Sequence, residues 1–192
     1  MTRRDQRSRY DRYLALGIAV SVGTLLPAVG IVQAQSAEVV QDCNQFAAVV
    51  NRGAASMSAF ESEIIAFSQN AAQAETLDDI TRAAQQYVDA VDDVVVLLDT
   101  MVVDLDALPL VDTQVSTYRS DYARLVTGFS DNLSLASDAM GEIAAVESET
   151  QLQTQLESSL VDMLQAVEEI EGLAAQTGTL IEGVNAYCGT TL

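Results

Sequence analysis

The sequence beyond residue 35 contains four long runs in which apolar residues recur alternately three and four positions apart. This spacing puts apolar side chains on one face of an α-helix, and each run sustains it for four or more heptads. A β-strand would need apolar residues at every second position, and no stretch has that period. The pattern therefore predicts long, packed helices over residues 37–70, 77–108, 112–145 and 149–186.

The residues between these runs are typical of helix ends. Thr76 and Asp79 resemble a capping box, with Asp where Glu or Gln is usual. Pro109 ends a helix, and Asp112 is a good N-cap for the next one. Because joints of about three to six residues force successive helices to be antiparallel neighbours, we expect an all-α fold, an antiparallel up-down-up-down four-helix bundle with long helices.

The first 34 residues have the composition of an export signal. Five arginines precede an apolar stretch over residues 14–32, and Val32-Gln33-Ala34 puts small residues at the cleavage positions. We expect a signal peptide over residues 1–34, followed by the bundle over residues 35–192. The alternative is an uncleaved membrane anchor, since the apolar stretch approaches the ~20 residues that span a bilayer.

Cys43 and Cys188 are the only cysteines in the sequence. In an up-down bundle the first helix starts where the last one ends, and an exported pair is expected to form a disulfide. Counting residues back from the joints, however, puts Cys43 level with residue 179, which is about 13 Å from Cys188 and too far for a disulfide. Either the last helix unwinds near Gly183 and Asn185, or one joint is longer than predicted.

The apolar faces of the four predicted helices contain no Asp or Glu, so we expect an uncharged centre. Asn132 is the strongly polar residue on the apolar face of the third helix, and the same level count puts it opposite Tyr87. We predict a hydrogen bond between Tyr87 and Asn132 that fixes the register of the core.

The composition excludes several kinds of chemistry. The sequence has no His, which removes the usual nucleophile–base pairs and His-ligated haem, zinc and di-iron sites. We therefore expect no catalytic, cofactor or metal site.

The sequence beyond residue 34 is strongly acidic. Five of the nine arginines and two of the 28 acids precede residue 35, and there is no Lys, so the rest carries a net charge of −22. We expect no nucleic-acid partner and no membrane binding after cleavage. The acidity suits either a high-salt environment or a basic partner.

Val96 and Val103 lie seven residues apart and point away from the apolar face of the helix over 77–108. A helix that is apolar on all sides is buried or covered by a partner. We expect a protein partner or self-association through this outer face. The alternative is two isolated exposed valines.

Together these features predict an exported, acidic helical bundle with a non-catalytic binding or structural role, such as an accessory subunit of an envelope or lumenal complex. We expect it in the periplasm or outside the cell, or in the thylakoid lumen of a photosynthetic organism. One alternative is a membrane-tethered sensory or ligand-binding bundle, if residues 14–32 remain attached. Another is a carboxylate-based enzyme, which would need a pair of buried carboxylates.

Overall fold

The computed structural model describes residues 36–189, apart from the side chains at positions 55, 56 and 58. Within this range the chain is all-helical, with four long helices packed together, so the prediction of an all-α fold with four long helices is confirmed. The predicted signal peptide or anchor of residues 1–34 lies outside the described residues. No helix within 36–189 has a stretch long and apolar enough to cross a membrane. The helices are α2 (Ala37–Gln73), α3 (Leu77–Asp106), α4 (Thr113–Ala144) and α5 (Glu149–Cys188).

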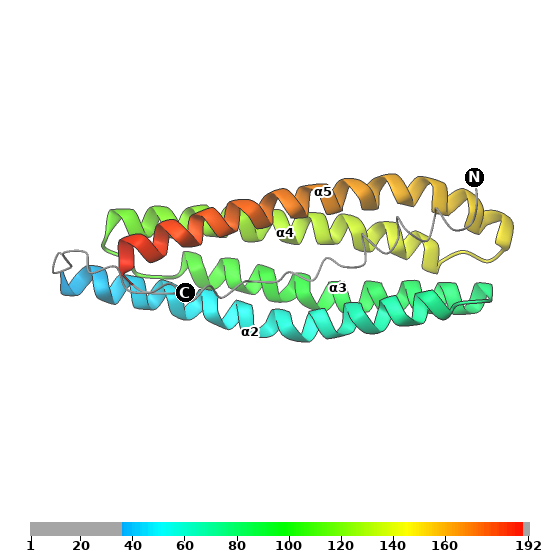
Figure 1. Cartoon of the computed structure of the whole chain (residues 1–192), viewed down its shortest axis with the longest axis horizontal. Helices are drawn as coiled ribbons and strands as arrows, with labels where there is room; N and C mark the ends of the chain where they lie inside the picture. Colours follow the sequence, from blue (N-terminus) through cyan, green and yellow to red (C-terminus); the bar gives the residue numbers. More distant parts are fainter. Residues whose placement is uncertain (1–35, 190–192) are drawn as a thin grey trace. The chain divides into compact units, whose positions relative to one another are not determined.

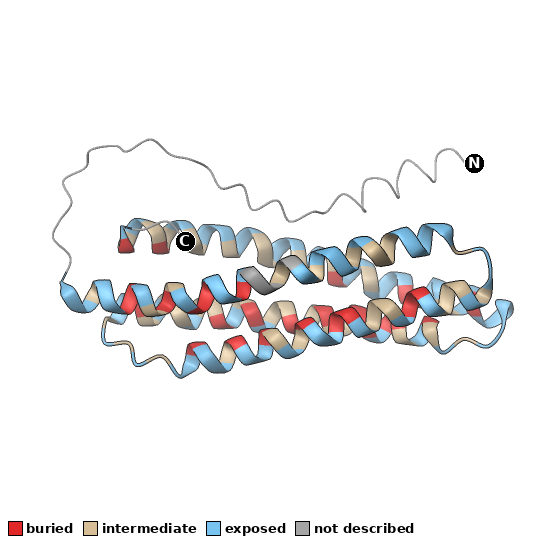
Figure 2. Ribbon diagram, turned by 90° about the horizontal axis from the view of Figure 1, so that it is seen from below, coloured by how far each residue is buried: buried red, intermediate tan, exposed pale blue. Residues whose placement is uncertain are grey.

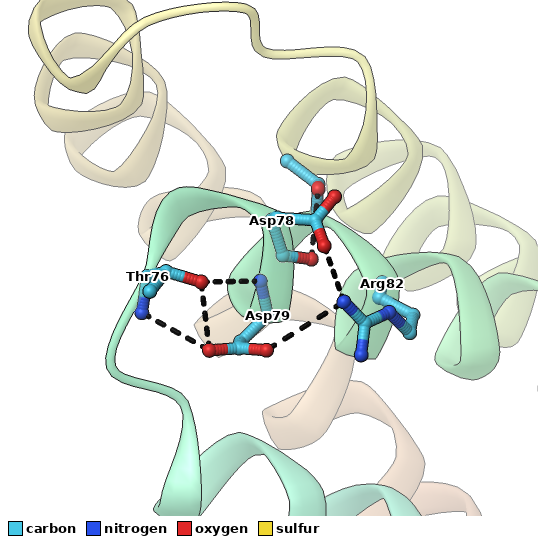
Figure 3. Close-up of polar contacts among 5 residues, drawn as sticks. Thr76, Asp78, Asp79 and Arg82 are labelled. Carbon is cyan, nitrogen blue, oxygen red and sulfur yellow. Dashed lines mark hydrogen bonds and ion pairs between the residues drawn. The ribbon is translucent and has the colours of Figure 1, made fainter.

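Each helix begins at a side chain that accepts a hydrogen bond from a backbone N–H of its first turn. At α3 this is the predicted capping box, in which Thr76 and Asp79 each accept from the backbone N–H of the other (Figure 3). Arg82 pairs with Asp78 and Asp79 beside it. The hydrogen bonds from Thr76 are the main reason that the pKa of Asp79 is lowered. The other N-caps are Ser36, Asp112 and Ser148.

The helices pack mainly against their neighbours in sequence. The contact between α3 and α4 is the most extensive, those of α4 with α5 and of α2 with α3 are smaller, and that of α2 with α5 is slight. Figure 1 shows this order, with α5 beside α4 and α2 beside α3. As a result α3 and α4 contain most of the buried residues.

Burial is uneven along α2 and α5. Among the described residues of α2, none after Gly53 is buried. In α5 only Ser159 and Ala166 are buried between Leu152 and Val184. Figure 2 shows this for α5, the helix that leads to the marked C-terminus, in which few residues are coloured as buried. The main core includes Phe46, Val91, Leu105, Val115 and Val184, and a smaller cluster includes Ala84, Met140, Ile143 and Leu152.

Candidate functional site

Cys43 and Cys188 form a disulfide, with their Cα atoms 5.9 Å apart. Of the two explanations considered for how they meet, the longer joint is correct. The helix α3 ends at Asp106, so residues 107–112 form a six-residue joint, and α5 stays helical through Gly183 and Asn185 as far as Cys188. Pro109 helps to keep this joint out of a helix, because its ring disfavours helical geometry at the residue before it.

Asp42, next to Cys43, is a buried carboxylate that the heptad pattern does not reveal. Only 3% of its surface is exposed. Its Oδ2 atom accepts hydrogen bonds from the backbone N–H groups of Val111 at 2.7 Å and of Asp112 at 2.6 Å. The apolar faces predicted from the sequence are free of Asp and Glu, but the expectation of an uncharged centre is wrong at this end of the bundle.

Asp112 connects this contact to α5. Its side chain caps α4 by accepting from the N–H of Val115, and it also accepts from the hydroxyl of Tyr187 at 3.1 Å. Partial burial, followed by the hydrogen bond to this carboxylate, raises the pKa of Tyr187. The helices α2, α4 and α5 and the 107–112 joint therefore meet in one network beside the disulfide.

The predicted hydrogen bond between Tyr87 and Asn132 is wrong. The amide nitrogen of Asn132 donates to the carbonyl oxygen of Gly128 on the preceding turn of α4, at 2.8 Å. The ring of Tyr87 packs on Phe67, with ring centroids 5.1 Å apart. The buried polar contacts between α3 and α4 are instead made by two serines one heptad apart, in the pairs Ser130–Asp99 (2.8 Å) and Ser137–Asp92 (3.2 Å).

Burial raises the pKa of Tyr87 to about 12. An unfolded tyrosine titrates near pH 10, so the folded protein holds this proton more tightly and unfolding releases it between about pH 10 and 12. The contribution of Tyr87 to stability is complete below about pH 10 and is lost as the pH rises to 12.

We therefore expect the free energy of unfolding to fall over this range by about 2 kcal/mol more in the wild type than in Tyr87→Phe. Urea titrations at pH 9 and 12, followed by circular dichroism, measure this difference. The two proteins differ only in the titrating hydroxyl, so equal losses would show that Tyr87 titrates normally.

Val96 and Val103, the predicted partner face, are exposed by 66% and 67%. Acids lie among them on the same helix, at Asp92, Asp99 and Asp104. Their exposure agrees with either of the two interpretations of the sequence, and their role as a docking face stays a prediction.

A larger exposed apolar set lies on α5. Leu156, Leu160 and Leu164 follow one another at every fourth position and are exposed by 45%, 50% and 50%. Leu156 and Leu160 belong to the alternating apolar pattern that predicts the helix over 149–186, so burial is expected for both. This expectation is wrong because α2 scarcely contacts α5. Leu164 lies outside the alternating pattern, and this extra leucine is the signal in the sequence that could have revealed a second apolar side.

Two adjoining surface hollows of about 460 and 330 Å³ lie between α2 and α3. Arg82 and Gln86 line both of them, together with acidic and amide side chains. Arg82 is already paired with Asp78 and Asp79. Within residues 36–189 no group of three or more Cys, Asp or Glu residues has the geometry to hold a metal ion.

Within residues 36–189, these features define a disulfide-linked, acidic protein of four helices whose largest exposed apolar set is on α5. Comparison of the chain with family models, curated proteins and solved structures gives no match.

Proposed function

We propose that the protein is exported and binds a protein partner through the exposed leucines of α5, without catalysing a reaction. The observation that carries this proposal is the set Leu156, Leu160 and Leu164, three large apolar side chains about half exposed over three successive turns. Contiguous exposed apolar surface with a polar rim is typical of protein interaction sites. The role of an accessory subunit in a larger envelope or lumenal complex is consistent with such a surface.

Export is supported by two separate features of the chain. The basic and apolar composition of residues 1–34 is typical of a signal peptide. The buried disulfide between Cys43 and Cys188 suits an oxidising compartment, because thiols are kept reduced in the cytosol.

A non-catalytic role is supported by the way in which the two carboxylates beside the disulfide are used. Asp42 accepts two backbone N–H groups, and Asp112 caps α4 and accepts from Tyr187. Both are engaged in holding the joint, whereas an acid–base pair would need its oxygens directed at a substrate. The lack of His in the sequence removes the most common general base.

The proposed topology is an antiparallel, up-down-up-down bundle. It is supported by the order of contacts, because Arg52 contacts Asp104 whereas Asn70, further along α2, contacts the earlier residue Gln86 of α3. The next pair of helices has the same order, in Asp99–Ser130 and Asp92–Ser137.

Photo-crosslinking in the producing cells tests the docking role. A photoreactive amino acid replaces Leu160 in one strain and Asp131, an exposed acid of α4, in a control strain. We expect a product of higher mass from position 160 and none from 131. If position 160 gives no crosslinked product, the proposal is wrong. It is also wrong if only a third strain, labelled at Val96, gives a product, because the docking face would then lie on α3.

The mass of the native N-terminus separates export with cleavage from the membrane-tethered alternative. A chain that begins at Gln35 supports cleavage after Ala34. A chain that still contains residues 14–32 would overturn the signal peptide and favour a tethered sensory or ligand-binding bundle.

A further inference from the structure

We propose that the partner, if the docking role above holds, presents an amphipathic helix with Lys or Arg beside its apolar stripe, and that this helix lies along the edge between α2 and α5. We call this edge the open face. It is defined by four exposed apolar residues, Ile65 of α2 and Leu156, Leu160 and Leu164 of α5.

The leucines of α5 are turned away from α4. Leu173 of α5 lies against Gly128 of α4, close enough to contact any Cβ added there at about 3 Å. At 3.6 residues per turn, Leu156, Leu160 and Leu164 lie about 100°, 140° and 180° around the helix from Leu173. The side of α5 that carries these leucines is therefore not the side that packs on α4.

Ile65 is turned away from α3 in the same manner. Arg52 and Asn70 mark the flank of α2 that faces α3, since they contact Asp104 and Gln86. Ile65 lies about 140° around α2 from each of them, and 59% of its surface is exposed. The apolar flanks of α2 and α5 that their sequence neighbours leave uncovered are thus both on the side where these two helices scarcely contact each other.

Ile65 and the leucines also lie at a similar height in the bundle. The contact between Asn70 and Gln86 puts Ile65 near the level of Val91, and Asp92 contacts Ser137 of α4. Counting from Gly128 and Leu173 along α4 and α5 puts Ser137 near the level of Leu164. One helix of about three turns could therefore contact all four residues, with anchors at the usual spacings of three, four and seven positions.

The charge around the open face selects a basic occupant. The exposed charged residues that border it are all acidic: Glu61 on α2 and Glu157, Glu168 and Glu171 on α5. Over its whole length α5 has seven acids and no Arg or Lys. A second copy of this chain would bring these carboxylates together, which is unfavourable, whereas a basic helix would place opposite charges at the rim.

Two synthetic helical peptides of about 18 residues, long enough for ~27 Å of helix, serve as probes. Both have Leu at positions i, i+3, i+4 and i+7, and the remaining positions are Lys in one and Glu in the other. Each is titrated into the protein purified from its producing cells, and Kd is measured by fluorescence anisotropy. We expect the Lys peptide to bind, the Glu peptide not to bind, and Kd to rise with added salt.

The decisive comparison uses a leucine variant and a control variant. Leu160→Gln with Leu164→Gln should weaken binding of the Lys peptide at least tenfold, as expected for two lost apolar anchors. Val111→Gln, which changes an exposed valine of the 107–112 joint, should leave Kd unchanged. The leucines are half exposed, so the double variant should keep the circular dichroism spectrum of the wild type.

Four results would overturn the inference. Equal Kd values for the wild type and the leucine variant would mean that charge alone attracts the peptide. A loss of binding in Val96→Gln with Val103→Gln, but not in the leucine variant, would place the site on α3. A dimer in sedimentation equilibrium that becomes a monomer in the leucine variant would show that a second copy covers the open face. A crosslinked partner at position 160 without binding of the Lys peptide would leave the docking role standing and reject only the basic helix.

Discussion

Replacing Cys43 and Cys188 together with alanine is expected to lower the free energy of unfolding by up to about 5 kcal/mol. The disulfide closes a loop of 144 residues, and a long closed loop restricts the unfolded chain strongly. Because α2 and α5 otherwise make little contact, it is also the main link between these two helices. Urea titration followed by circular dichroism compares the oxidised wild type with the double variant.

The matched control is the effect of reductant on each protein. Reductant should move the urea midpoint of the wild type towards that of the double variant, and it should not move the midpoint of the variant itself. The unfolded, oxidised wild type should also run faster on a non-reducing gel than its reduced form. Equal midpoints for the oxidised wild type and the double variant would contradict the role assigned to the disulfide.

The helices could be predicted from the sequence because their signals are local. Apolar residues at alternating three- and four-residue steps identify an apolar helix face, and the caps at Thr76 and Asp112 identify where helices begin. The height of Cys43 along the bundle could not be predicted by counting residues back from the joints. That count treats each residue of a joint as if it rose along the bundle axis by as much as a helical residue. The joint over residues 107–112 is non-helical and longer than expected, so α4 starts further from the end of α3.

The extent of the core could be predicted only in part. Leu152 and Leu156 fit the same apolar pattern, yet Leu152 is buried and Leu156 is exposed. The pattern shows which side of a helix is apolar, but burial also requires a neighbouring helix to reach that side. The slight contact between α2 and α5 is a property of the whole assembly, and no local sequence signal encodes it.

The polar contacts of the core were the least predictable part. Asn132 was expected to reach Tyr87, but its amide finds a carbonyl acceptor on its own helix, at Gly128. Asn side chains often prefer such local acceptors to distant partners. The contacts at Ser130 and Ser137 depend on the register between α3 and α4, which the joint sets and the heptad pattern does not.

Asp42→Ala is expected to lower the free energy of unfolding by about 3 kcal/mol. The substitution leaves two partly buried backbone N–H groups, those of Val111 and Asp112, without their acceptor, and each such loss costs about 1–3 kcal/mol. The joint over residues 107–112 then loses its attachment to α2, so α4 and the disulfide end should both loosen. Urea titration gives the free energy, and hydrogen exchange at Val111 and Asp112 should become faster.

Glu61→Ala is the matched control, because it removes one exposed acid from the same helix and changes the net charge equally. Relief of repulsion in so acidic a protein should make this control neutral or slightly stabilising at low salt. Asp42→Asn keeps an oxygen that can accept from both N–H groups, so it should lose less than half as much stability as Asp42→Ala. If Asp42→Ala instead matches Glu61→Ala, the carboxylate does not hold the joint, and the contact between α2 and residues 107–112 must depend on apolar packing and the disulfide.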